Sequence, residues 1–405
     1  MNSQNLLAFR APTVLPDRIL PDGLVICRGD RIEEVRERAT RIPKQALLVE
    51  APAKGCIAPG FVDLQVHGGA GSDHMDGTTA AVRTANRAHL LRGTTTIFPT
   101  TTTGSPGQME RILRACRTVR DEWRPTMAEG ARIGGVHLYG PFFVEKKVGA
   151  HATEGRRDPS REEFQRYFKL GIVKIATCAA ELPGAQAFYR AAARAGCLIT
   201  CGHSDASWGE MARAFAAGMR HVDHFWCAMS SVPSVRVRCG SPVQASIAEF
   251  VLANSEMSTE VIADGEHLSK ELLEFAWRMK RPRRLCLVTD ASRAQNMPPV
   301  RYRIGPVEDG SCIESNGKVG LGPIREGLTG KGLASTVVGM DTMIRNMKKL
   351  TAAPIEEVIR MATLTPAERA GIEAESGSLE PGKRADLIVL EQNFTFSPFT
   401  LWVSG

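Results

Sequence analysis

The middle of the chain alternates between two hydrophobic patterns. Short runs of apolar and β-branched residues, typical of buried strands, are followed by stretches in which apolar positions recur with helical spacing. Eight strands are predicted, at residues 61–67, 94–99, 134–138, 173–178, 198–201, 221–225, 259–263 and 285–289. The clearest predicted helices are 79–91, 110–122, 185–195, 208–217 and 270–279. Eight βα units in about 230 residues indicate a (β/α)8 barrel, with a doubly wound open sheet as the alternative.

The two ends of the chain have a different pattern. Residues 1–55 contain short strands broken by turns, and residues 376–405 contain a Pro-Gly turn followed by a β-branched run. Two β-rich ends around a βα middle predict that both termini build one small β-sandwich domain. We therefore divide the chain into residues 1–55 plus 376–405 for this domain and residues 56–375 for the barrel.

Composition narrows the class of protein. Of 405 residues, 43% are hydrophobic and 23% are charged, which is ordinary for a globular protein. The net charge is +7, but the basic residues are spread over much of the chain, so we expect no nucleic-acid partner. No apolar run reaches the roughly 18 residues of a membrane span, and the N-terminus lacks a signal peptide. The ten cysteines form no C-x-x-C pair, which favours reduced thiols and a cytoplasmic location.

Polar residues gather where the predicted strands end. In a barrel, chemistry is carried by the loops that follow the carboxyl ends of the strands. Seven of the nine histidines lie in these segments, namely His67, His137, His151, His203, His221, His224 and His267. Imidazoles together with carboxylates suit a divalent metal ion such as zinc, which can activate a water molecule for hydrolysis. Asp290 ends the last strand and could move the proton of that water, or could simply cap a helix.

Several motifs together resemble the amidohydrolase superfamily, and in particular the N-acetylglucosamine-6-phosphate deacetylases. They occur in the same order over almost the whole chain, although each alone is a weak signal. The motifs are the segments 59–68 (PGFVDLQVHG), 202–206 (GHSDA), 263–267 (ADGEH), 287–291 (LVTDA) and 361–367 (MATLTPA).

The resemblance implies a function and a set of site residues. It implies hydrolysis of the acetamide of an amino sugar phosphate by a water that one metal ion per subunit activates, with Asp290 as general acid and base. The ion would be zinc, with iron, manganese or cobalt as alternatives, and His203 and His224 would bind it. It also implies a homodimer in which Arg236 or Arg238 of a neighbouring subunit holds the phosphate. The remaining substrate-binding positions are Ala150, His151, Cys227, Ala228, His267 and a substrate loop of Leu333, Ala334 and Ser335.

The chain departs from the family at several of these positions. Tyr139 stands where the family has a glutamate that binds the metal, and Cys227 stands where it has an asparagine that contacts the ligand. Ser335 replaces a smaller residue, and Gln65 replaces the first histidine of a His-x-His motif that ends at His67. Tyr139, His67, Gln65 or Asp290 could complete the metal shell. Two alternatives to the family reaction stay open: hydrolysis of a different amide or cyclic amide, and non-catalytic binding of a sugar phosphate.

Overall fold

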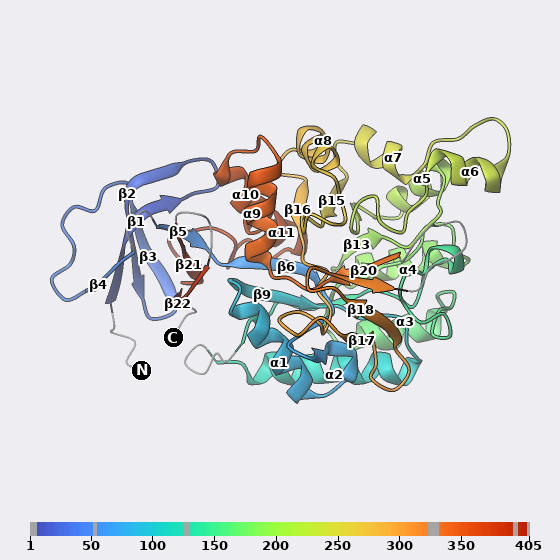
Figure 1. Ribbon diagram of the computed structural model, residues 1–405, viewed down its shortest axis with the longest axis horizontal. Coiled ribbons are helices and arrows are strands. Elements are labelled where there is room, and N and C mark those ends of the chain that lie inside the picture. The colour runs from blue at the N-terminus through green and yellow to red at the C-terminus, as the bar shows by residue number, and fades with distance from the viewer. Residues whose placement is uncertain (1–5, 52–54, 125–129, 323–331, 392–395, 403–405) are drawn as a thin grey trace.

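The molecule contains two main β-structures, a sheet built from both ends of the chain and a barrel built from its middle. The computed structural model describes residues 6–51, 55–124, 130–322, 332–391 and 396–402. Strands from both ends of the chain form a sheet at one end of the molecule, on the left of Figure 1, while the central residues form a ring of strands surrounded by helices. Among the described residues, no helix combines the length and the apolar character that crossing a membrane requires.

The ring is a closed parallel barrel. Parallel pairing runs from β6 to β9 and onward from β11 through each following strand to β16. Two isolated bridges complete the circle, between Thr100 and His137 and between Val66 and Ala291. This closure confirms the predicted barrel and excludes the open sheet. Its strands are β6 (Phe61–Val66), β9 (Thr94–Pro99), β11 (Val136–Leu138), β12 (Val173–Thr177), β13 (Leu198–Cys201), β14 (His221–Val222), β15 (Ser258–Val261) and β16 (Leu285–Leu287), with β10 (Arg132–Ile133) paired to β9.

Helices cover the outside of the barrel and begin where the sequence provides caps. The Ser105 hydroxyl accepts a hydrogen bond from the backbone N–H of Gln108, whose side chain accepts one from the Ser105 N–H, and Pro106 fixes the first turn. Apolar faces then pack on the strands in one core that includes Phe98, Leu113 and Phe188. The helices are α1 (Thr79–Leu90), α2 (Pro106–Glu122), α3 (Arg161–Lys169), α4 (Ala185–Arg194), α5 (Trp208–Ala216), α6 (Val232–Cys239), α7 (Ile247–Ala253), α8 (Lys270–Lys280), α9 (Met340–Leu350), α10 (Ile355–Met361) and α11 (Leu364–Ala370).

The predicted small β domain contains a seven-stranded sheet that joins both ends of the chain. Its path is β22-β21-β5-β1-β2-β3, with β4 also paired to β1. The link between the two ends is the antiparallel pairing of β21 with β5, in which Ile388 lies opposite Ala58. Apolar residues pack on both faces, so the sheet has a core of its own. The exact domain boundaries stay a prediction. The strands are β1 (Leu6–Val14), β2 (Ile19–Arg28), β3 (Arg31–Arg36), β4 (Leu47–Glu50), β5 (Cys56–Pro59), β21 (Leu387–Leu390) and β22 (Phe396–Trp402).

A further antiparallel sheet follows the last barrel strand. It runs β17 (Arg301–Ile304), β18 (Ser311–Ser315), β19 (Val319–Gly322) and β20 (Gly332–Thr336). The end of β20 is fixed to the barrel, because Thr336 N–H donates to the Asp290 carbonyl and Ser292 N–H donates to the Thr336 carbonyl, both at 3.0 Å. Leu333, Ala334 and Ser335 therefore belong to a strand, and the predicted substrate loop is corrected to β20. The sequence reading missed this sheet because its strands are short and partly exposed.

Candidate active site

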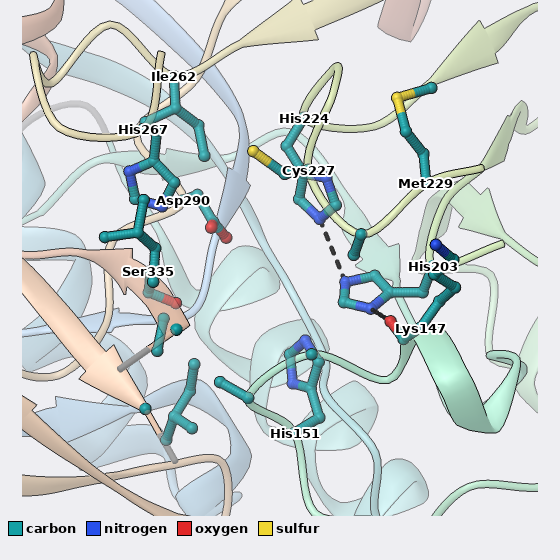
Figure 2. A pocket seen from close by; sticks show the side chains of 18 of the residues that line it. Lys147, His151, His203, His224, Cys227, Met229, Ile262, His267, Asp290 and Ser335 are labelled. Atoms are coloured by element: carbon teal, nitrogen blue, oxygen red, sulfur yellow. Dashed lines mark hydrogen bonds between the residues drawn. The ribbon is translucent and has the colours of Figure 1, made fainter. Parts of the chain in front are cut away.

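A cavity of about 580 Å³ opens at the carboxyl ends of the barrel strands. Figure 2 shows His203 and His224 on one side of it, Asp290, His267 and Ser335 on the opposite side, and His151 between them. Residues from the loops after β11, β13, β14 and β15 meet β20 here. The position agrees with the general rule that barrels place their chemistry at this end of the strands.

Backbone strain is concentrated in the lining of this cavity. Five non-glycine residues of the lining have left-handed φ angles: His203 at 47°, Trp226 at 68°, Ala228 at 47°, Asp290 at 48° and Ser335 at 61°. Such angles are unfavourable for residues with a Cβ, and they persist where the surrounding structure enforces them. Their clustering is an indication of a functional site that is independent of any motif.

His203 and His224 form a pair of neutral imidazoles. Each follows the end of its strand by two residues, and their Nε2 atoms lie 3.2 Å apart. His203 Nδ1 donates to the Lys147 carbonyl at 2.6 Å, and the His203 ring stacks on Phe143 with centroids 4.1 Å apart. Burial lowers the pKa of both histidines, that of His203 strongly. Each ring is therefore neutral and has one nitrogen with a lone pair.

Asp290 is held as an anion on the opposite side of the cavity. Its Oδ1 accepts a hydrogen bond from Gln65 Nε2 at 3.0 Å and lies 3.1 Å from His67 Nε2. Burial opposes ionisation, but the hydrogen bond from His67 and the nearby His224 and His267 together lower the pKa of Asp290. Burial by itself would lower the pKa of His67. The hydrogen bond to Asp290 and the negative charge of Asp290 outweigh this effect, so the pKa of His67 is raised. Gln65 and His67, candidates for the metal shell, thus contact the carboxylate in this structure.

Tyr139 lies between these two sides. The residue is 1% exposed, and its hydroxyl group is hydrogen-bonded to His224 Nε2. Its backbone is fixed by Thr101, whose hydroxyl accepts from the Tyr139 N–H at 2.8 Å and donates to the Tyr139 carbonyl at 2.7 Å. Burial, followed by the negative charge of Asp290, raises the pKa of Tyr139 well above its usual value of about 10. The side chain is therefore a neutral phenol.

The residues present provide two good ligands for a divalent metal ion. At a separation of 3.2 Å, the Nε2 atoms of His203 and His224 can each lie about 2.0–2.1 Å from one zinc ion. Within the part of the chain that the structure describes, no group of three or more His, Cys, Asp or Glu side chains is placed to hold a metal. The oxygen beside the pair is that of Tyr139. The site therefore fits an ion held by two imidazoles, with a neutral phenol at the position for which the sequence comparison expects an anionic ligand.

The residues predicted to meet the substrate mostly line the same cavity. His267 is positioned by Asp264, whose Oδ2 lies 2.7 Å from His267 Nδ1. Arg236 is the exception, because it lies exposed on α6 and does not line the cavity of its own chain. The predicted residues in the lining are Ala150, His151, Cys227, Ala228, His267, Leu333, Ala334 and Ser335.

Two of the seven histidines assigned to the strand ends are corrected. His137 lies in the barrel interior, with Nδ1 3.0 Å from the Leu64 carbonyl and Nε2 2.8 Å from Thr177 Oγ1. His221 begins β14 and contacts Ser258 at 2.7 Å and Glu260 at 3.0 Å. Both are fully buried and do not line the cavity, so they are structural.

Sequence reasoning missed several residues of the lining. Lys146 and Lys147 bring two cationic side chains to the cavity, while Met229, Ile262 and Ile304 bring apolar ones. The paired lysines just before the Gly-Ala-His segment that ends at residue 151 were a usable signal. The apolar residues could not be distinguished from ordinary core positions.

Fold and site together define a class: a (β/α)8-barrel hydrolase with imidazoles and an anionic carboxylate at the mouth of the barrel. The Amidohydrolase family matches residues 56–405, and the chain belongs to that family. It is accordingly a hydrolase that acts on an amide bond. Enzymes of this kind depend on a metal ion.

Relatives with assigned activities span most of the chain. N-acetylglucosamine-6-phosphate deacetylase of Vibrio furnissii is 30% identical, over 86% of this chain and 82% of that protein. N-acetylgalactosamine-6-phosphate deacetylase of Escherichia coli O157:H7 is 28% identical, over 86% of each. The solved structure of a Mycobacterium smegmatis N-acetyl-D-glucosamine-6-phosphate deacetylase mutant, in complex with N-acetyl-D-glucosamine-6-phosphate, has a TM-score of 0.84 at 26% identity, covering 97% of both chains.

Proposed function

We propose that this protein removes the acetyl group from an N-acetylated hexosamine 6-phosphate. The observation that carries the proposal is the anionic Asp290 facing the neutral His203–His224 pair across one cavity. This is the arrangement that amide hydrolysis needs, because water must lose a proton and the leaving amine must gain one. The substrates named for the relatives support the same reaction.

His203 and His224 would hold one divalent ion per subunit, zinc in the first place, with iron, manganese or cobalt as alternatives. Such an ion, when bound, polarises the amide carbonyl and lowers the pKa of a coordinated water. The neutral state of both imidazoles suits them to this role, since a protonated ring has no lone pair to offer.

Asp290 would carry the proton between the two halves of the reaction. Gln65 and His67 both contact Oδ1, which fixes the plane of the carboxylate and leaves Oδ2 for the reacting groups. As an anion, Asp290 takes a proton from the attacking water, and it then gives that proton to the amine that leaves. His67 and Gln65 are positioning residues in this scheme.

The cavity also suits an anionic substrate. Lys146 and Lys147 reach its lining, and His151 and His267 add two imidazoles. Lys147 lies 3.5 Å from Asp205, whereas Lys146 is exposed and makes no ion pair among the described residues, so Lys146 is the better phosphate ligand.

We further propose a cytoplasmic homodimer in which Arg236 of a second copy completes the phosphate site. The ten cysteines are all free in the structure, which is consistent with that compartment.

A second candidate is hydrolysis of a related amide or cyclic amide. The observation in its favour is Cys227, whose thiol lines the cavity where the sequence comparison expects an amide. A thiol is a weak hydrogen-bond donor, so this position would recognise a less polar group.

The test is acetate release from N-acetylglucosamine 6-phosphate, N-acetylgalactosamine 6-phosphate and unphosphorylated N-acetylglucosamine, with added zinc, manganese or cobalt. We expect turnover of a phosphorylated sugar and a loss of about 10²–10⁴-fold in Asp290→Asn, with an unchanged circular dichroism spectrum. No acetate from any of the sugars would favour the second candidate or a binding role. Full activity in Asp290→Asn would remove Asp290 from the mechanism.

A further inference from the structure

The hydrogen-bonding capacity of the His203–His224 pair is already used in this structure. His203 Nδ1 carries the proton that it donates to the Lys147 carbonyl at 2.6 Å. A neutral imidazole has only one N–H, so His203 Nε2 must present a lone pair. That lone pair points at His224 Nε2, 3.2 Å away.

The contacts of His224 involve mainly one ring nitrogen, Nε2. Its Nδ1 is buried and has no hydrogen-bond partner among the described residues. Its Nε2 faces both His203 Nε2 and the Tyr139 hydroxyl. If Nε2 carries a hydrogen, it donates; if it carries a lone pair, it accepts from Tyr139. In either state the atom that a metal ion would need is engaged in a hydrogen bond.

Tyr139 cannot easily move away from His224. Its ring lies between 4.9 and 5.9 Å, centroid to centroid, from six other rings. Its backbone is fixed on both sides by Thr101. The rings around it are those of His67, His137, Phe143, His151, His203 and His224.

We propose that Tyr139 competes with the metal ion instead of binding it. Its hydroxyl group holds His224 Nε2 in a hydrogen bond that a divalent ion has to break, so Tyr139 limits the affinity of the His203–His224 pair for metal. This inference rests on the proposed function, which assigns His203 and His224 as the metal ligands. It adds Tyr139 as a residue that sets the affinity of the site for the metal ion.

The test is the binding of Zn²⁺ to the full-length, metal-depleted protein, measured by calorimetry or by competition with a chelating dye. Tyr139→Phe removes the hydroxyl and keeps the ring, so we expect Zn²⁺ to bind about tenfold more tightly, the worth of one hydrogen bond. The matched control is Tyr189→Phe. Tyr189 is equally buried and donates to the Cys178 carbonyl at 2.6 Å, away from the cavity, and this variant should bind Zn²⁺ as the wild type does. His224→Ala should abolish the binding and so show that the titrated site is this one.

The opposite role for Tyr139 makes the opposite prediction. A ligand phenolate would weaken Zn²⁺ binding in Tyr139→Phe, and it would give the wild type a phenolate-to-metal charge-transfer band on loading with Cu²⁺. Either result, or an unchanged Zn²⁺ affinity, would overturn the proposal. The Cu²⁺ spectrum needs no variant, so it tests for a phenolate ligand even if Tyr139→Phe does not fold. Neither measurement requires turnover, so failure of the deacetylase assay remains a separate outcome.

Discussion

The two ends of the same barrel are built on different principles. At the carboxyl ends of the strands, five non-glycine residues with left-handed φ angles and the charged side chains of Lys146 and Asp290 surround a cavity. At the amino ends, α11 packs against β6 and β16, and the segment that includes it contains the ion pairs Arg360–Glu368 and Arg384–Asp386. Among the described non-glycine residues just before the barrel strands, only Arg281 has a comparable φ angle.

Hydrogen bonds and a buried ion pair occupy the amino end of the barrel, opposite the cavity at the carboxyl ends of the strands. The Gly60 N–H, just before β6, donates to the Asp386 carbonyl at 3.0 Å, and Thr365 Oγ1 donates to the Pro282 carbonyl at 2.6 Å. Arg384 Nε lies 3.2 Å from Asp386 Oδ2 in an ion pair that is less than a tenth exposed. Polar groups at this end stabilise the fold, whereas those at the other end are left available for a substrate. Substitutions at the two ends should therefore affect different properties.

The largest effect on stability is expected at the amino end. Arg384→Ala removes a buried guanidinium that pairs with Asp386 and Asp30 and lies over the Trp123 ring, which should lower the free energy of unfolding by about 3–5 kcal/mol in denaturant titration. Activity per folded molecule should be unchanged at low temperature. Arg28→Ala is the control, because its 2.8 Å pair with Glu33 is exposed and should contribute at most about 1 kcal/mol. If the free energy of unfolding falls as little in Arg384→Ala as in the control, the buried ion pair does not stabilise this end of the barrel.

The barrel itself could be predicted from the sequence, because each strand signal is local. The runs at 94–99 and 198–201 became β9 and β13 with the same bounds, and the helix predicted from residue 185 became α4. Period and β-branching are sufficient for such elements. The sheet of β17–β20 was missed, since strands of four or five residues with exposed faces give no clear alternation.

The site was only partly predictable, for a physical reason. Asp290, His203 and His224 follow the ends of strands by two or three residues, so the rule for barrels places them at the rim. Whether a histidine at a strand turns inward or faces the cavity depends on the register of the neighbouring strands, and His137 and His221 turned inward to Thr177 and Glu260. The contact of Tyr139 with His224 joins positions 85 residues apart and no local pattern carries it.

A smaller effect is expected between the two ends, in the barrel interior. Burial raises the pKa of Asp63 to about 7, against the hydrogen bonds from Thr289 and the Gln65 N–H that lower it. Because the folded pKa lies above the unfolded value of about 3.9, the stability conferred by the protonated form is present below pH 4 and is lost as the pH rises through 7. Asp63→Asn cannot ionise. Its stability relative to the wild type should therefore increase between pH 4 and pH 8, by up to about 4 kcal/mol.

Thermal or denaturant unfolding at several pH values measures this difference directly. The comparison at about pH 3 is the internal control, because Asp63 is then largely protonated in both folded and unfolded chains. Parallel stability curves for the variant and the wild type would mean that Asp63 ionises without cost in the folded barrel. In that case the barrel interior would tolerate a charged carboxylate as the rim does, unlike the packed amino end.

The smallest effect is expected at the carboxyl end, on substrate recognition alone. Burial, together with the charges of Asp290 and Asp264, raises the pKa of Cys227 to about 12, so its side chain is a neutral thiol. Cys227→Asn supplies an amide with two donors and one acceptor, and it should lower KM for N-acetylglucosamine 6-phosphate about tenfold with little change in stability. Cys312→Asn, at an exposed cysteine outside the cavity, is the matched control and should change neither. If KM stays constant or rises in Cys227→Asn, the natural substrate has a less polar group at this position, and the second candidate function gains support over the first.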